Sequence, residues 1–507
     1  MLSLWGTQRK LCDGISRREL LRVGGLSALG WGLQEQWGVP SLANAVSSPS
    51  GRPSFGRAKA CILLFLYGSP PQHETFDPKP EAPAEIQGEM KAIATPVPGL
   101  NVCERLPRTA RLVDRTTVVR SLTHPYPLHG VAYAVSGLPT YTPDLETRPR
   151  DVRHWPFIGS VVDYAQSQRV SSASTELPSA PAVPRHMALP WMLNSKTDLL
   201  VNAGPFAGFL GARHDPIWTD FNGKGTRKVP KYTDGQQQEF VDPYGGVTAD
   251  GAFQLSQDSM LQPELSLERL GMRRSLLAQL NRTVRHADRL AAAGFDVPRQ
   301  QAYELLTSTR LHAALDLQRE PASVREAYGM TLFGQSCLAA RRLVEGGVRF
   351  VTVFWDGFGQ FANCAWDTHN NHFPRLKEYL LPGFDLAYPA LIEDLDQRGL
   401  LDETLVLCLS EHGRTPQIDS KPKGAGRHHW SRAYSAILAG GGIARGRVVG
   451  ATDRLAGEVV DTPVSPKDVL ATSLHLLGVD PHLIVRDPQG RPVPVAGAGR
   501  VREELLG

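Results

Sequence analysis

Histidine and acidic residues gather in the C-terminal half of the chain. Five of the fifteen histidines lie between positions 367 and 429, a higher density than elsewhere. They fall in three clusters: Asp367-Thr368-His369 with His372, Glu411-His412-Gly413-Arg414, and His428-His429. Imidazole and carboxylate groups together suit divalent ions such as Zn²⁺ and Mn²⁺, and two ions about 3.5–4 Å apart can clamp a phosphoryl or sulfuryl group. The sequence therefore predicts a site for one or two divalent ions, with Zn²⁺ and Mn²⁺ favoured.

These clusters follow apolar runs that are typical of buried strands. Such runs occupy residues 61–66, 117–120, 350–354, 404–409 and 433–439, and helical spacing covers 265–344 and 388–398. This alternation predicts an α/β fold with a doubly wound, mostly parallel sheet covered by helices on both faces. Ligands bind at the carboxyl ends of the strands in such sheets, so we expect the clusters to meet at one sheet edge.

Two further acidic residues follow the first predicted strand, Glu74 and Asp77. The stretch 140–260 is rich in Pro, Gly and Asp and predicts long irregular loops, within an insertion of about 140–330.

The overall composition excludes several classes of protein. The chain of 507 residues has 55 basic and 51 acidic side chains, which gives no electrostatic argument for nucleic acid as a partner. Its six cysteines are scattered without a CxxC spacing, so neither a disulfide framework nor a zinc–thiolate site is expected. No segment is long and apolar enough to predict a membrane span, and the oligomeric state is left open.

The N-terminus has the plan of an export signal. Ser16-Arg17-Arg18-Glu19-Leu20-Leu21 opens a short apolar stretch, and Ala43-Asn44-Ala45 fits a cleavage site for small residues. Adjacent arginines before such a stretch resemble a twin-arginine signal; an ordinary Sec signal and a retained anchor are the alternatives. We therefore predict a signal over 1–45, a linker over 46–58, one domain over 59–503, and a periplasmic or secreted location.

A set of short motifs resembles the DUF1501 family, uncharacterised exported proteins of the alkaline phosphatase/sulfatase-like superfamily. The resemblance runs from about residue 61 to the C-terminus. It is carried by TFDPKP (75–80), VVRSLTH (118–124), AGFLG (207–211), GQSCLAARRLVEGGVRFVTV (334–353), WDTH (366–369), GRTP (413–416), LAGGGI (438–443) and VSPKDVLAT (464–472). It implies an alkaline phosphatase-like sheet with metals at the strand ends.

The resemblance also implies a ligand set. One metal would be held by Asp367, by His369 or His372, and by His429. The second would be held by Glu411 and His412, and by the acidic group after the first strand, which is Glu74 with Asp77 as its competitor. Three positions of this set depart from the family, since Glu74 stands for a usual Asp, His372 for Asn and His412 for Phe; beside it, His428 stands for a usual Asp.

The nucleophile of the superfamily has no evident counterpart here. Its hydrolases carry Ser, Thr or a modified Cys where the helix after the second strand begins, at the positive end of the helix dipole. In this chain that helix is expected to begin near His129-Gly130, without a hydroxyl in its first turn. Ser121 and Thr123 lie upstream, and His129 could be a metal ligand, a base or a nucleophile. Arg414 is either an ion-pair partner of the site carboxylates or an anion clamp.

Two functions remain open at this point. The first is an exported metal-dependent hydrolase acting on phosphate or sulfate esters of a small molecule or a polysaccharide. The second is a non-catalytic surface or binding protein that keeps the fold but lacks the nucleophile.

The export signal gives the first testable prediction. Replacing both Arg17 and Arg18 by Lys is expected to block export of the folded precursor, because a twin-arginine signal is read by a receptor. Fractionation of expressing cells followed by immunoblotting measures it. Normal export of the double variant would indicate a Sec signal or an anchor instead.

Overall fold

The computed structural model describes residues 53–127, 129, 131, 134, 145, 147–173, 183–197, 204–233, 236–256, 307–359, 366–420 and 424–507. The predicted export signal and most of the linker lie outside these residues. So do most of the helix expected after position 130 and the helical pattern over 265–306.

The centre of the fold is a sheet of nine strands in the order β15-β4-β14-β11-β1-β10-β5-β6-β9. Only β14 and β9 run against the others. The bounds are β1 Ala60–Leu66, β4 Thr116–Leu122, β5 His186–Leu189, β6 Ile217–Asn222, β9 Ala252–Leu255, β10 Phe350–Trp355, β11 Thr404–Leu409, β14 Tyr434–Ala439 and β15 Arg447–Val449. The predicted mostly parallel sheet is confirmed, and each of the five predicted strands is part of it.

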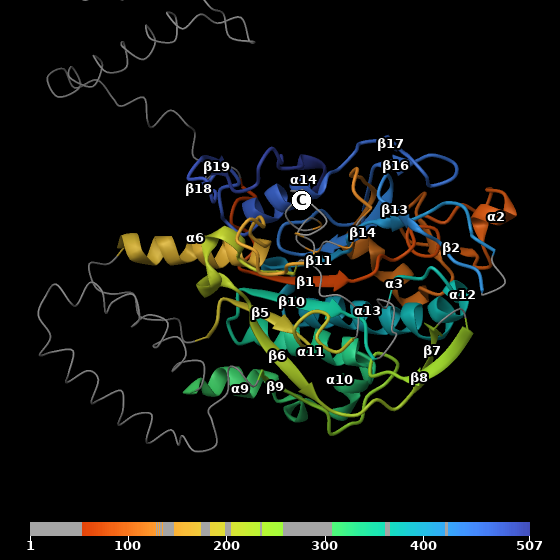
Figure 1. The fold of residues 1–507 in the computed structure, drawn as a ribbon, viewed down its shortest axis with the longest axis horizontal. Coiled ribbons are helices and arrows are strands. Elements are labelled where there is room, and N and C mark those ends of the chain that lie inside the picture. The colour runs from red at the N-terminus through yellow and green to blue at the C-terminus, as the bar shows by residue number, and fades with distance from the viewer. Residues whose placement is uncertain are drawn as a thin grey trace, which may run out of the picture. The chain divides into compact units, whose positions relative to one another are not determined.

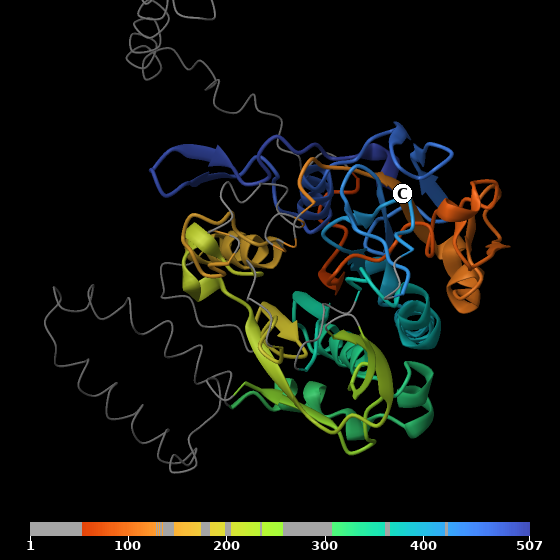
Figure 2. The ribbon, with the colours of Figure 1, turned by 45° about the vertical axis from the view of Figure 1, so that its right-hand side comes forward.

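Strand β1 lies in the middle of the sheet because its apolar run can be buried on both faces. Ile62 and Leu64 point into one hydrophobic core, and Cys61, Leu63 and Phe65 point into a second. Helices α11 (Leu332–Glu345) and α13 (Leu381–Gln397) complete the first core, whereas α6 (Ile158–Ala173) and α14 (Pro466–Leu476) complete the second. Figures 1 and 2 show these two pairs on opposite sides of the sheet, so helices cover both faces as predicted.

The other elements of the fold are helices and two-stranded hairpins. The helices are α2 Ala84–Gln87, α3 Pro107–Leu112, α6 Ile158–Ala173, α9 Thr309–Leu315, α10 Ala322–Ala327, α11 Leu332–Glu345, α12 His372–Arg375, α13 Leu381–Gln397 and α14 Pro466–Leu476. The hairpins pair β2 Ala92–Ala94 with β3 Asn101–Cys103, β7 Lys228–Thr233 with β8 Gln236–Val241, β12 Gly413–Arg414 with β13 His429–Trp430, β16 Ala451–Thr452 with β17 Val459–Asp461, and β18 Ile484–Arg486 with β19 Pro492–Pro494.

Two of the helices that cover the sheet, α11 and α14, are capped at their N-termini by side chains. Thr331 accepts a hydrogen bond from the Gly334 N–H at the start of α11. Ser465 and Asp468 form a reciprocal capping box at the start of α14. Such caps satisfy N–H groups that have no partner within the helix, so both helix starts are specified locally.

The prediction of irregular structure over 140–260 was wrong in part. This stretch contains α6 and contributes β5, β6 and β9 to the central sheet. Strand β5 has only four residues, too few to show a period in the sequence. Its stability comes from pairing with β10 and β6, which is a tertiary contact. Within the described ranges, no helix combines the length and apolarity that a bilayer crossing requires.

Candidate metal centre

The ends of β1 and β11 are tied together at one edge of the sheet. The two strands are parallel neighbours, so the loops that follow them lie side by side. The Gly68 N–H donates to Glu411 Oε1 at 2.7 Å, and the His412 N–H donates to Ser69 Oγ at 3.2 Å. Ser69 has a φ of 70°, a left-handed conformation that is unfavourable for a residue with a Cβ and that requires support from its surroundings. These bonds fix Glu411 and His412 relative to the first strand.

A hairpin carries the last histidine cluster onto the same edge. In the β12–β13 pair, His429 lies opposite Arg414. The loop before β13 passes so close to His369 that a Cβ on Gly426 would lie 1.7 Å from the His369 carbonyl oxygen. Glycine at 426 is therefore required for this approach, which brings His429 and His369 together.

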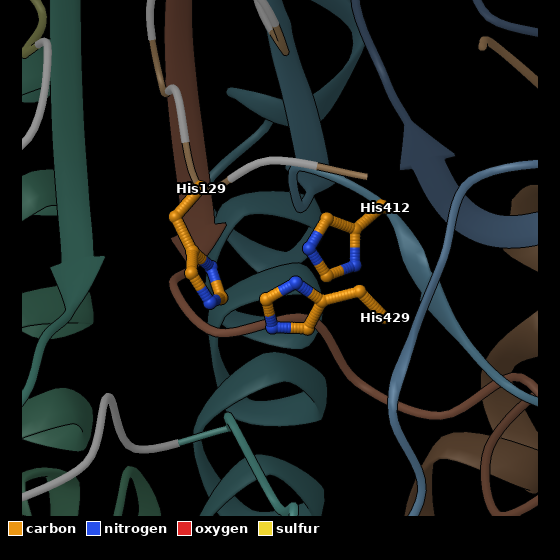
Figure 3. A group of neighbouring side chains, drawn as sticks. All are labelled: His129, His412 and His429. Atoms are coloured by element: carbon orange, nitrogen blue, oxygen red, sulfur yellow. The ribbon is translucent and has the colours of Figure 1, made fainter. Parts of the chain in front are cut away.

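Four histidines and one aspartate converge at this edge in two overlapping groups. The ligand atoms of His129, His412 and His429 lie within 4.8 Å of one another, and those of Asp367, His369 and His429 do the same. Figure 3 shows the three rings of the first group approaching from separate stretches of the chain. His429 belongs to both groups, so the two form one continuous cluster.

Each of the four rings is held through its Nδ1 atom. The partners are Glu411 Oε1 for His129 (2.8 Å), the Gly413 carbonyl for His412 (2.8 Å), the Pro127 carbonyl for His429 (3.1 Å) and His428 Nδ1 for His369 (2.8 Å). When Nδ1 carries the proton, Nε2 keeps its lone pair, which is how histidines are oriented in metal sites. The Nε2 atoms of His369 and His429 lie 3.0 Å apart, within hydrogen-bond distance of each other, and 2.9 and 3.3 Å from Asp367 Oδ1.

The charges of the cluster are strongly coupled. Burial alone would raise the pKa of Asp367, but Arg414 and His129 hold it well below its usual value. Burial alone would lower the pKa of His129, but Asp367 and Glu411 raise it to about 10. Burial lowers the pKa values of His412 and His429, the latter against the effect of Asp367. At neutral pH the metal-free cluster therefore has a protonated His129 beside neutral His412 and His429.

Arg414 is an ion-pair partner of the site. Its side chain is fully buried and lies 2.6 Å from Asp367 Oδ1. It also donates to the carbonyl oxygens of Ser69 (3.0 Å) and Gly68. These bonds direct the guanidinium into the protein, so of the two roles considered for Arg414 the geometry supports the ion pair.

Glu74 and His372 lie together, apart from the two groups that could hold a metal. Arg427 donates to Glu74 Oε1 at 2.6 Å, and His372 Nε2 lies 3.3 Å from Glu74 Oε2. Burial alone would raise the pKa of Glu74, but Arg427 and His372 lower it. The buried carboxylate is thus compensated by a guanidinium, as an ion would otherwise compensate it.

Asp77 is likewise occupied by basic and hydroxyl groups. It pairs with Lys79 at 3.0 Å and with Arg120 at 3.5 Å, and it accepts a hydrogen bond from Thr452. The structure thus brings His129, Asp367, His369, His412 and His429 into one cluster with Glu411 behind it, and leaves Glu74, Asp77 and His372 outside. Arg427 could not be recognised from the sequence as the partner of Glu74, because the two residues are 353 positions apart.

The fold and the site define an α/β protein with a histidine-rich candidate metal centre at the carboxyl edge of its sheet. The chain belongs to the DUF1501 family, described as "Protein of unknown function (DUF1501)", which matches residues 58–506. No curated protein is similar enough to be matched to it.

Solved structures similar to this chain include a sulfatase and a synthase. Ps i-CgsB in complex with k-i-k-neocarrahexaose is 14% identical, over 83% of this chain and 72% of that one, with a TM-score of 0.35. PsFucS1 sulfatase from Pseudoalteromonas sp. is 12% identical, over 84% and 68%, with a TM-score of 0.35. The lipoteichoic acid synthase LtaP from Listeria monocytogenes is 9% identical, over 85% and 75%, with a TM-score of 0.32. Likeness at this level does not assign an activity to this chain.

The Glu74–Arg427 pair gives a prediction about stability. Glu74→Gln leaves the Arg427 charge buried without its partner, so the free energy of unfolding should fall by about 3–5 kcal/mol. The bound metal content of the folded protein should stay unchanged, because Glu74 lies outside the cluster. Urea denaturation and elemental analysis measure the two quantities.

A matched control is Glu458→Gln, which makes the same change in the exposed pair with Arg432 and should cost at most about 1 kcal/mol. If Glu74→Gln does not fold, the double variant Glu74→Gln/Arg427→Met removes the stranded charge. Loss of one metal equivalent from either form would show that Glu74 is a ligand after all.

Proposed function

We propose that this protein is an exported, metal-dependent hydrolase of phosphate or sulfate esters. The observation that carries the proposal is the common orientation of four histidines: each is held through Nδ1, and the cluster that their rings form includes the Asp367 carboxylate. His412 Nε2 has no hydrogen-bond partner among the described residues, and the Nε2 atoms of His129, His369 and His429 lie 2.9–3.6 Å from the carboxylate of Asp367. A set of Nε2 atoms gathered around one carboxylate suits a divalent ion.

The residues present fit Zn²⁺ or Mn²⁺. Two buried atoms at the cluster, His412 Nε2 and Glu411 Oε2, have no hydrogen-bond partner within the described part of the chain. Unpaired polar atoms are costly in a protein interior, and an ion would satisfy them. Imidazole and carboxylate donors are those that both ions accept. One or two divalent ions held here would supply Lewis-acid polarisation of an ester oxygen and activation of water.

His129 takes the place of a ligand rather than that of a nucleophile. Its ring belongs to the first group that could hold a metal. Glu411 accepts a hydrogen bond from the His129 Nδ1–H, in the way that carboxylates orient metal-bound histidines. The nearby hydroxyls of Ser69 and Thr368 are both buried and hydrogen-bonded. Ser69 Oγ accepts from the His412 N–H, and Thr368 Oγ1 bonds to His372 Nδ1. This arrangement supports direct attack by water on the ester over a covalent intermediate on a hydroxyl side chain.

The cluster is open enough to receive a substrate. The side chains of Asp367, His129, His429 and His369 keep 13%, 16%, 25% and 28% of their surface exposed. A small-molecule ester or an ester group on a polysaccharide could therefore reach the site without a rearrangement of the sheet. Export to the periplasm or the cell exterior is proposed from the Arg17-Arg18 motif.

The ligand assignment predicts the effect of two substitutions. His412→Phe should remove one metal equivalent or weaken binding by at least about 10–100-fold, because losing a ligand costs no less than losing the group that orients one. His429→Ala should weaken binding more, since His429 belongs to both groups. Metal content by elemental analysis, and turnover of phosphate and sulfate esters in added Zn²⁺ or Mn²⁺, should fall together.

The control is His482→Gln, a histidine on the surface, which should change neither quantity. A wild-type protein that binds metal but hydrolyses no ester across small-molecule and polysaccharide substrates would indicate the binding function instead. A protein that binds neither Zn²⁺ nor Mn²⁺ would refute the metal centre.

The raised pKa of His129 predicts that metal affinity depends on pH. A ligand must be neutral, and His129 with a pKa of about 10 is protonated in the metal-free protein. Binding at pH 7 should release about one proton per ion, and affinity should rise about tenfold per pH unit below pH 10. Calorimetric titrations in two buffers of different ionisation enthalpy measure the proton. In His129→Gln the release should vanish; if it persists, another group supplies the proton.

A further inference from the structure

Two loops at the carboxyl edge of the sheet carry large apolar side chains that face solvent. Tyr126 follows β4 and is 40% exposed, and Met192 follows β5 and is 39% exposed. Among the residues that the structure describes, seven large hydrophobic side chains are exposed in this way, and Tyr126 is the only aromatic one. An aromatic ring exposed beside a candidate site suits a ligand with an apolar face.

The loop of Tyr126 is fastened to the candidate metal centre. His124 Nε2 donates to the Glu411 carbonyl at 2.7 Å, and the Tyr126 N–H donates to His124 Nδ1 at 3.2 Å. The next carbonyl along the chain, that of Pro127, accepts from His429 Nδ1 at 3.1 Å. Since consecutive Cα atoms are about 3.8 Å apart, the Tyr126 Cα lies less than about 10 Å from the His429 ring. The tyrosine is therefore held next to the candidate ligands.

The loop of Met192 is held at the same edge through the end of β10. The backbone N–H and the Nδ2 of Asn194 donate to the Asp356 carboxylate at 2.8 and 3.1 Å. The Gly359 N–H donates to the Lys196 carbonyl at 2.9 Å. Because β5 and β10 are parallel neighbours, the loops that follow them lie at one edge of the sheet.

The metal centre lies between these two loops. Its ligand loops follow β11 and the neighbouring β1, and in the sheet order β4-β14-β11-β1-β10-β5 both strands stand between β4 and β5. Neighbouring strands are about 4.8 Å apart, so β4 and β5 are separated by about 24 Å. A small ester would occupy the centre alone, whereas an extended chain bearing the ester would reach both loops.

The chemistry of the two side chains suits a chain of sugars. A pyranose ring has a face of C–H groups and a rim of hydroxyls, which matches an aromatic ring with an apolar body and a polar tip. A lipid surface would instead require a continuous apolar face, and here the polar metal centre separates Tyr126 from Met192.

We infer that the substrate is a polysaccharide carrying sulfate or phosphate esters, and that its sugar rings pack against Tyr126 and Met192 on the two sides of the metal centre. The inference rests on the proposed function, since the centre would cleave the ester. It deepens that function by choosing the polysaccharide over the small molecule and by naming two residues that determine this preference.

The first test is substrate preference, measured on the full chain as the ratio of kcat/KM for a sulfated hexasaccharide to that for 4-nitrophenyl sulfate, and likewise for the phosphate esters. Tyr126→Ala should lower this ratio about 10-fold, because the lost ring packs against the polymer. Met192→Ala should lower it in the same direction. Tyr126→Phe keeps the ring and should retain the ratio, and so should Ile484→Ala, a truncation of an exposed side chain on β18.

The second test is binding without turnover, measured by calorimetric titration of the chelator-treated protein with the same hexasaccharides. Tyr126→Ala should bind about 10-fold more weakly than the wild type. Unchanged ratios and affinities in both alanine variants overturn the inference, as does a wild type that binds anionic phospholipid vesicles but no hexasaccharide. Binding that depends on Tyr126 without hydrolysis of any ester refutes the proposed function while supporting the polysaccharide surface.

Discussion

The guanidinium of Arg414 is buried where three stretches of the chain meet. It bonds to the Gly68 and Ser69 carbonyls after β1, to the Asp367 carboxylate, and to the Arg427 carbonyl before β13. A charge in this position is costly to bury unless its donors are all directed at acceptors, and here main-chain carbonyls and one carboxylate provide them. The candidate metal centre depends on this contact because two of these stretches carry Asp367, His369 and His429, and Arg414 itself lies two residues after His412.

Two buried arginines each form an ion pair with a different acidic group at the sheet edge. Arg414 partly neutralises Asp367, which still lies within reach of His129, His369 and His429. Arg427 forms the ion pair with Glu74, and His372 lies beside the same carboxylate. The two carboxylates therefore differ in exposure and in partners: the Glu74 side chain is 1% exposed and that of Asp367 13%. One has a fixed guanidinium as its main cation, and the other faces a cluster of imidazoles that can accept a mobile ion.

The histidines of the centre depend on acceptors supplied by unrelated parts of the fold. Two of the acceptors are carbonyl oxygens, of Gly413 and Pro127, and the other two are side chains, Glu411 and His428. Each such bond restricts a ring to one orientation. Four rings restricted in this way before an ion binds lose less entropy when it does, which is the physical advantage of a preorganised site.

The residue types and their periods were sufficient to predict the type of fold and the kinds of donor at the candidate site. Continuous apolar runs can be satisfied only in strands buried on both faces, so β1, β10 and β11 were predictable from the residues alone. Because parallel strands end at one edge, the proximity of Asp367 and His429 followed from the same pattern. The kinds of donor, imidazole and carboxylate, were likewise evident before any contact was known.

The tertiary structure alone decided which donors face one another. Glu74 and Asp367 are both acidic groups near strand ends, and nothing local shows that Arg427 takes one of them from 353 positions away. Three alternative roles were possible for His129 from the sequence, because its nearest charged groups, Asp367 and Glu411, are distant along the chain. Short strands such as β5 were also missed, since four residues show no period and gain their stability from neighbours in the sheet. Residue types and periods are local properties, whereas the pairing of charges and the direction of a ring depend on contacts that only the folded chain creates.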